Sequence, residues 1–300
     1  MENSLKTKTI LVTGGAGFIG SHLIEELLKD KQNRIISLDN YFTGSEKNHQ
    51  SGAEYRDGHT KDIETLVPET PDIIYHLGEY PRITRSIDEP AAVFDMNMVG
   101  TFNVLEYWRK RKCRLIYAGS STKFTSANDD GVAGRDRSPY SWSKGSNSDL
   151  VRNYGKWFHL PYSIAYFYNA YGPGERADWK DGYGTVIEVF KQKFLAGAPC
   201  EVNAPGIQTR AFTHVDDTVN ALVLIGEKGE ADEYAISAKE VFSLLDVAHM
   251  FGCEVVMKPQ TKTSRSSGAD DTSKLEAFGW KQKYTLKEYI ENIKKSISSI

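Results

Sequence analysis

The chain has 300 residues, of which 40% are hydrophobic, enough for one large domain or two modest ones with a buried core. Its net charge of -3 excludes the strongly basic surface that nucleic-acid binding usually requires. The N-terminus is polar, no run of about eighteen apolar residues occurs, and the cysteines are widely spaced. We therefore expect no nucleic-acid partner, export signal, membrane span, disulfide framework or metal site, which fits a reducing cytoplasm.

The chain begins with a predicted strand, a glycine-rich turn and a helix. The apolar run at 10–12 predicts the strand, and apolar residues at helical spacing over 23–28 predict the helix. Between them, Gly14, Gly17 and Gly20 recur at intervals of 3 residues. The first glycine permits a tight turn, the second lets the backbone approach a diphosphate, and the third lets helix and strand pack. Phosphate oxygens then meet the N–H groups at the start of the helix.

A second predicted strand, at 35–39, ends in Asp39, which follows Gly20 by 19 residues. A carboxylate at this point can accept both ribose hydroxyls of an adenosine, and it would repel the 2′-phosphate of NADP. The turn and the acid together predict an NAD site. The alternative is a structural glycine turn followed by an aspartate without a binding role.

Strands and helices continue to alternate along the chain. We expect a strand and a helix at 54–57 and 61–67, a strand at 72–77, a long helix at 90–111 and a strand at 115–118. This alternation implies parallel strands with right-handed crossovers, hence an α/β fold with a doubly wound sheet of Rossmann type. Ligands of such sheets bind at the carboxyl ends of the strands.

Ser120, Tyr140 and Lys144 form a candidate catalytic group. Ser120 follows a predicted strand, and Tyr140 comes 20 residues later. On a helix, Tyr140 and Lys144 share one face, so the ammonium can favour the ionised phenol. A free tyrosine titrates near ~10, so taking a hydroxyl proton at neutral pH needs this help and that of a positive nicotinamide ring. For an isolated Tyr-x-x-x-Lys, an ordinary helix surface is the simpler interpretation.

With these motifs in this order, the chain resembles the extended short-chain dehydrogenase/reductases, specifically the NAD-dependent nucleotide-sugar epimerase/dehydratase family. The resemblance covers nearly the whole chain. Besides the glycine turn and the Tyr140–Lys144 pair, the matching segments are His76-Leu77, Asn97 with Gly100-Thr101, and residues 168–174, 210–217, 271–274 and 278–280.

The resemblance implies NAD as the cofactor and a nucleotide-diphosphate sugar as the substrate. The residues expected at the cofactor are Gly14, Gly17, Phe18, Ile19, Gly20, Asp39, Asn40, Leu77, Tyr140 and Lys144. Those expected at the substrate are Ser120, Ser121, Asn169 and Arg210. Asn169 would contact the diphosphate or its neighbouring sugar, and the planar guanidinium of Arg210 would neutralise the diphosphate.

The resemblance also implies a division of the chain. We expect an NAD-binding Rossmann domain at 1–168, to which 210–237 returns through a strand at 233–236. The smaller substrate-binding α/β region would comprise 169–209 and 238–300. Its expected helices lie at 184–196, 241–251 and 286–297.

A homodimer is expected by analogy with family members. Its interface would join the helix at 90–111 and the helix that carries Tyr140, with Trp108 and Trp157 among an apolar surplus on these helices.

Three segments depart from the family pattern. Relatives carry an acid that reaches the adenine where this chain has His59, and the loop with Arg82 is unusual. Family dehydratases place Asp-Glu after the catalytic serine, decarboxylases place a Glu, and 3,5-epimerases place a Cys at the second position. This chain has Ser121 and Thr122 there, followed by Lys123.

We therefore predict a cytoplasmic, NAD-dependent C4-epimerase of nucleotide sugars that acts through a transient 4-keto intermediate. Tyr140 would take the C4 hydroxyl proton, with Ser120 bonded to the same oxygen, and no further acid or base is needed. One alternative is a 4-oxidoreductase, or a 4,6-dehydratase whose acids come from elsewhere, such as Glu79 or Glu175. Another is a non-catalytic NAD-binding protein, although binding alone needs no phenolate.

Overall fold

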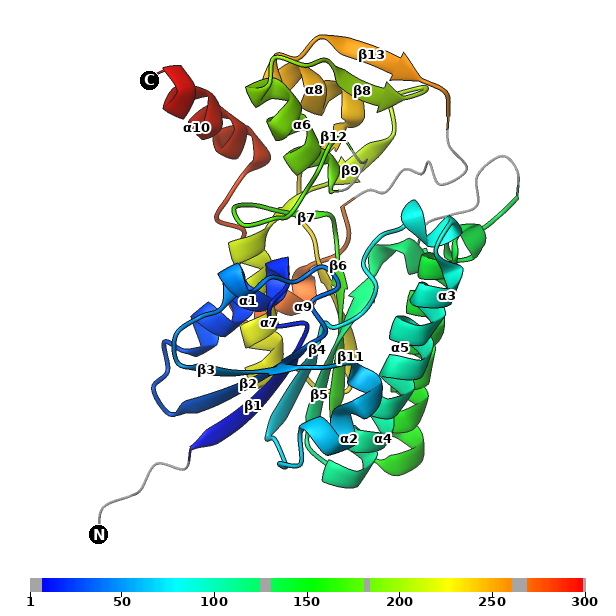
Figure 1. Cartoon of the computed structure of the whole chain (residues 1–300), viewed down its shortest axis with the longest axis vertical. Coiled ribbons are helices and arrows are strands. Elements are labelled where there is room, and N and C mark those ends of the chain that lie inside the picture. The colour runs from blue at the N-terminus through cyan, green and yellow to red at the C-terminus, as the bar shows by residue number, and fades with distance from the viewer. Residues whose placement is uncertain (1–6, 125–130, 181–183, 261–268, 299–300) are drawn as a thin grey trace.

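Seven parallel strands form the main sheet of the computed structural model, which describes residues 7–124, 131–180, 184–260 and 269–298 (Figure 1). Their order is β11-β6-β5-β4-β1-β2-β3, which confirms the predicted doubly wound α/β sheet. The strands are β1 Lys8–Thr13, β2 Asn33–Asp39, β3 Ala53–Asp57, β4 Ile73–His76, β5 Arg114–Ser120, β6 Tyr162–Phe167 and β11 Asp232–Ile236.

Helices cover both faces of this sheet (Figure 1). On one face α1 (Phe18–Leu27) packs against α7 (Val215–Lys228), and on the other α4 (Thr101–Arg111) packs against α5 (Pro139–Phe158) and α2 (Ile63–Leu66). The inner strands β1, β2, β4, β5 and β6 are largely apolar and buried, as parallel strands between two helical layers must be, whereas the edge strand β3 is polar and partly exposed. Among the residues described, no helix is both long and apolar enough to cross a membrane.

The order of the strands reverses between β1 and β4. β1 pairs with β2 on one side and with β4 on the other, and the connections that follow β1 and β4 leave the sheet in opposite directions. In a doubly wound sheet this reversal opens a crevice at the carboxyl ends of the two strands. The glycine turn after β1 and the loop after β4 meet there.

A smaller group of elements lies beyond the carboxyl ends of the strands, at the top of Figure 1. It has two short pairs of strands, parallel β8 with β13 and antiparallel β9 with β12, and a core of its own beneath three helices. These elements are α6 Val186–Leu195, β8 Cys200–Asn203, β9 Thr209–Ala211, β12 Val241–Ser243, α8 Leu244–Phe251, β13 Val255–Lys258 and α10 Leu286–Ser298.

Short elements complete the chain. β7 (Ala170–Tyr171) pairs with β10 (Thr213–His214) between the sheet and the smaller group. The others are η1 Glu46–Asn48, η2 Thr60–Asp62, η3 Arg85–Ile87, α3 Pro90–Val93, η4 Phe94–Gly100, η5 Ser121–Phe124, η6 Gly134–Arg137 and α9 Ser273–Ala277. β11 pairs with β6 in the main sheet, as the return of 210–237 requires. The division into domains at 168 and 238 stays a prediction.

The helix predicted at 90–111 is confirmed, and within it a π-helical stretch, η4, separates α3 from α4. Two other details of the sequence prediction were wrong. The helix predicted from residue 241 begins at Leu244, since the three residues before it pair with β9. Trp108 is fully buried in the core of the main sheet, so it adds nothing to an exposed apolar surface.

Candidate functional site

At two of the three evenly spaced glycines of the turn, a side chain would collide with the backbone. Gly14 has a φ of +74°, and a Cβ there would lie 2.8 Å from the Cα of Gly78, in the loop after β4. A Cβ on Gly20 would lie 2.1 Å from the carbonyl oxygen of Gly14. The predicted reasons for Gly14 and Gly20, a tight turn and the close approach of helix and strand, therefore agree with the geometry.

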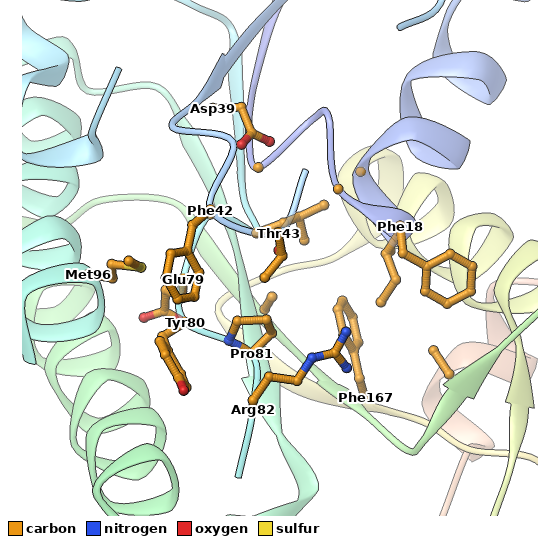
Figure 2. Close-up of a pocket in the computed structure, with 18 of the residues that line it drawn as sticks. Phe18, Asp39, Phe42, Thr43, Glu79, Tyr80, Pro81, Arg82, Met96 and Phe167 are labelled. Atoms are coloured by element: carbon orange, nitrogen blue, oxygen red, sulfur yellow. The ribbon is translucent and has the colours of Figure 1, made fainter. Parts of the chain in front are cut away.

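Asp39 is buried at the end of β2 beside this turn. Its carboxylate accepts the N–H of Ala16 at 2.9 Å and the N–H of Tyr41 at 2.8 Å. Burial raises the pKa of Asp39 and the two backbone bonds oppose that rise. Figure 2 shows Asp39 at one end of a cavity, and Phe18 belongs to another part of the wall of the same cavity. The turn, the start of α1 and this acid form a cradle that fits the adenosine and diphosphate of a dinucleotide.

The cavity collects most of the predicted site. All ten residues predicted at the cofactor line it, as do Ser120, Ser121 and Asn169. The Asn169 amide donates to the carbonyl of Ala211 at 2.8 Å, from a backbone with a φ of 39°. Arg210 is partly buried on β9 and is not among the residues that line this cavity, so its role at the diphosphate stays a prediction.

The three candidate catalytic residues come from β5 and α5. Ser120 ends β5, and its Oγ accepts a bond of 3.0 Å from the hydroxyl of Thr122. Ser138 caps α5 by accepting the N–H of Ser141 at 3.1 Å, which places Tyr140 in the first turn and Lys144 one turn later. All three catalytic candidates line the same cavity as the glycine turn.

Lys144 has a partner that the sequence did not reveal. Its ammonium donates to a carboxylate oxygen of Glu79 and to the carbonyl of Ala118. Burial pushes the pKa of Glu79 up, but the Lys144 charge and the hydrogen bonds to the carboxylate outweigh burial and hold that pKa below its usual range. Glu79 is therefore an anion.

Loop residues that the sequence analysis did not assign also line the cavity. The rings of Phe42 and Tyr80 lie 5.4 Å apart between centroids, on one side of the view in Figure 2. The Arg82 guanidinium points into the cavity, where it donates to the carbonyl of Arg176 at 3.4 Å and lies 3.9 Å from Glu175. Tyr80 and Arg82 follow β4, so the rule that ligands bind at the carboxyl ends of strands would have found them. No sequence pattern indicates that Phe42 lines the cavity.

The structure accounts for two residues that the sequence left without a role. Lys123 pairs with Asp149 on α5 at 3.0 Å and donates to the hydroxyl of Tyr166 at 3.3 Å. It therefore joins η5 to α5 outside the cavity. The His59 side chain accepts the N–H of Lys61 at 3.0 Å and so caps η2, and it is one of the residues that line the cavity. In the part of the chain that is described, no group of three or more His, Cys, Asp or Glu side chains could hold a metal ion.

The chain is similar in sequence and fold to proteins named as nucleotide-sugar epimerases and decarboxylases. Residues 10–237 match the model of the NAD dependent epimerase/dehydratase family. A putative UDP-glucose 4-epimerase of Methanocaldococcus jannaschii is 30% identical over 95% of this chain and 96% of its own. UDP-glucuronic acid decarboxylase 3 of Arabidopsis thaliana is 29% identical over 93% of this chain and 86% of its own. The NAD complex of UDP-glucose 4-epimerase from Thermus thermophilus is 26% identical, with a TM-score of 0.83 over 94% of this chain and 96% of that one.

Proposed function

We propose that this chain, which belongs to the NAD-dependent epimerase/dehydratase family, inverts the C4 centre of a nucleotide-diphosphate sugar. NAD is the cofactor of this chain. One observation carries the proposal: Ser120, Tyr140 and Lys144 line the same cavity as the glycine turn and Asp39, while Ser121 and Thr122 stand where an elimination would need acids.

NAD fits the residues present, since Gly14 and Gly20 bring the backbone close and Asp39 lies where the adenosine ribose belongs. When bound, it supplies a hydride acceptor that later returns the hydride to the sugar. The chain holds the two ends of the dinucleotide with different elements. The turn after β1 and the end of β2 face the adenosine end, and β5 and α5 face the reacting end.

Tyr140 removes the proton from the C4 hydroxyl. It returns this proton to the same oxygen after the 4-keto sugar has rotated and presents its opposite face to the nicotinamide. Lys144 supplies a positive charge that favours the phenolate, and Ser120 donates a hydrogen bond to the same sugar oxygen. Ser120 is free to donate because its Oγ accepts from Thr122 rather than giving up its own proton. The reaction therefore needs no acid besides Tyr140.

An elimination of water needs one group that takes the C5 proton and another that protonates the departing hydroxyl. Ser121 and Thr122 have no pKa suited to either role near neutrality. Glu79 lines the cavity but is held as an anion by Lys144, so it is a poor proton donor. These side chains favour epimerisation over dehydration.

One observation favours a 4,6-dehydratase as the second candidate. Burial raises the pKa of Glu175, which accepts the N–H and hydroxyl of Thr185 at 2.8 and 2.7 Å. A carboxyl group with a raised pKa is the kind of acid that a dehydratase uses, and its neighbours Gly174 and Arg176 line the cavity. A movement of this loop toward the sugar would bring the acid into reach.

A cytoplasmic homodimer completes the proposal. Large apolar side chains are exposed along the outer faces of α4 and α5 and the π-helical stretch η4, where Phe94 meets the indole of Trp142 edge to face, 5.9 Å between centroids. The exposed set comprises Phe94, Val99, Phe102, Trp142, Trp157 and Phe158. A second copy that pairs the same helices would bury this surface in a two-fold interface.

The proposed reaction is tested by incubating the pure protein with a panel of UDP-, GDP-, CDP- and dTDP-sugars and resolving the products by NMR. We expect one sugar to give its C4 epimer without added NADH. A product formed only in stoichiometric amounts with NADH, as a stable 4-keto sugar, would instead indicate a one-way oxidoreductase.

A further inference from the structure

Glu79 lies just beyond the carboxyl end of β4, where its side chain is 3% exposed and the ammonium of Lys144 is its ionic partner. Burial removes water from both the carboxylate and the ammonium of this ion pair. Its net contribution to stability therefore depends on the hydrogen bonds that surround the two groups. The inference drawn from it rests on the proposed function, in which Tyr140 is the base and Lys144 its electrostatic support.

Three elements donate hydrogen bonds to this carboxylate. Thr101 of α4 donates at 2.7 Å, Asn147 of α5 at 2.8 Å and Tyr117 of β5 at 3.0 Å. With Lys144 as a further donor, both carboxylate oxygens are satisfied. Glu79 is therefore fixed in place and stays charged.

A chain of hydrogen bonds through His76 leads to Thr101 and determines which group donates in each bond. The N–H of Gly78 donates to the hydroxyl of Thr13 at 3.0 Å, and that hydroxyl lies 2.7 Å from Nδ1 of His76. Nε2 of His76 lies 2.9 Å from the hydroxyl of Thr101. Because Thr101 gives its only proton to Glu79, it accepts from Nε2, and Nδ1 accepts from Thr13. The neutral histidine thus connects the glycine-turn strand to the carboxylate.

The charges around Tyr140 can be accounted for group by group. The titratable side chains gathered here are His76, Glu79, Tyr117, Tyr140 and Lys144. Burial lowers the pKa of His76 to about 4, and burial raises the pKa of Tyr117 well above its usual value, so both are neutral around pH 7. Of these five side chains, Lys144 and Glu79 carry charges, which are opposite in sign, and the cavity wall also includes the guanidinium groups of Arg82 and Arg176.

We propose that Glu79 is a positioning residue for the catalytic pair: it holds the Lys144 ammonium against the end of β5 and balances its charge, so that the Tyr140 phenol faces a paired lysine instead of an unpaired one. The carbonyl of Ala118 also accepts from Lys144, so the ammonium keeps one hydrogen-bond partner on β5 in a variant that lacks the carboxylate. Glu79 thereby limits the electrostatic support that Lys144 gives to the Tyr140 phenolate.

The test follows the ionisation of Tyr140 by ultraviolet difference absorbance of tyrosinate, without sugar. Titrations of the wild type and of Glu79→Gln are each compared with the same protein carrying Tyr140→Phe, so that the difference isolates one phenol among the 16 tyrosines. We expect Glu79→Gln to lower the midpoint by roughly half to one pH unit. The acid limb of the pH–activity profile moves by the same amount and in the same direction.

Glu69→Gln is the matched control. Glu69 lies before the amino end of β4, pairs with Arg56 at 2.6 Å and is remote from the cavity lining. Its neutralisation removes the same charge and leaves the Tyr140 midpoint unchanged. If Glu79→Gln does not fold, Glu79→Ser replaces it, since a small neutral side chain leaves space for water to serve the same donors.

The proposal would be overturned if the midpoint of the Tyr140 titration stayed the same or rose in folded Glu79→Gln. This holds even if the protein converted a sugar of the panel. A lowered midpoint in a protein that converts no sugar of the panel would support it while refuting the proposed function. The two failures are therefore distinguishable.

Discussion

Asp39, at the end of β2, accepts the N–H of Ala16 in the middle of the glycine turn at 2.9 Å. The second oxygen of the carboxylate accepts the N–H of Tyr41 at 2.8 Å. These two bonds tie the acid to the turn, so that the groups expected to bind the ribose and the diphosphate form one unit. The position of the carboxylate is thus set before any ligand binds.

This arrangement predicts the choice of cofactor. A 2′-phosphate would face the buried carboxylate, so NAD should bind about a hundredfold more tightly than NADP, or ~2.7 kcal/mol. Asp39→Ser should reduce the ratio to below about tenfold. Asp57→Ser, at the end of the neighbouring strand β3, is the control and should leave it unchanged. Calorimetric titrations that gave equal affinities for the two cofactors with the wild type would refute the assignment.

The role of Tyr140 predicts that Tyr140→Phe keeps its fold and its affinity for NAD but loses roughly 10²–10⁴-fold in kcat, the usual share of a general base. Tyr154→Phe is a matched control on the same helix. Its hydroxyl donates to Glu106 at 2.9 Å, outside the cavity, so its loss should cost about 1 kcal/mol of stability and no turnover. Near-normal turnover of Tyr140→Phe would place the base elsewhere.

His76 predicts how stability depends on pH. Its pKa is lowered to about 4 by burial, whereas a histidine in the unfolded chain titrates near ~6.5. Between these values the unfolded state binds the extra proton, so the free energy of unfolding should fall as the pH drops from about 6.5 to about 4, by at most about 3 kcal/mol. In His76→Asn this part of the pH dependence disappears. Urea unfolding of both proteins across the range gives the difference, and parallel curves would contradict the assignment.

The exposed apolar helix faces predict a dimer at micromolar concentration in solution scattering. Phe102→Glu should yield monomers, because it places a charge on a side chain that is 49% exposed in the middle of this surface. Ile207→Glu is the control, since Ile207 is 67% exposed in the loop between β8 and β9 and should not affect the mass. A wild type that scatters as a monomer would exclude the interface.

Much of the site could be predicted because its signals are local. The spacing of Gly14, Gly17 and Gly20 and the four-residue step from Tyr140 to Lys144 fix geometry within one turn or one helix. Alternating strands and helices then force parallel pairing, which brings these segments to one edge of the sheet.

The features that could not be predicted depend on contacts between distant segments. Glu79 and Lys144 are 65 residues apart, and nothing near either residue specifies the pairing. Lys123 has no role in the sequence pattern and acquires one only when α5 brings Asp149 to it. The strand at 241–243 was missed because its partner, β9, is about thirty residues earlier, and helical periodicity ignores such pairing.

The central claim is that the chain inverts C4 and does not eliminate water, and one measurement tests it most directly. The protein is incubated in heavy water with the sugar nucleotide that it converts, and the product is analysed by mass spectrometry and NMR. We predict a 4-epimer of unchanged mass, with no deuterium at C5 and no need for added NADH, because neither Ser121 nor Thr122 can take a carbon-bound proton. A product lighter by one water, with deuterium at C5, would contradict this claim and would make Glu175 the first acid to replace.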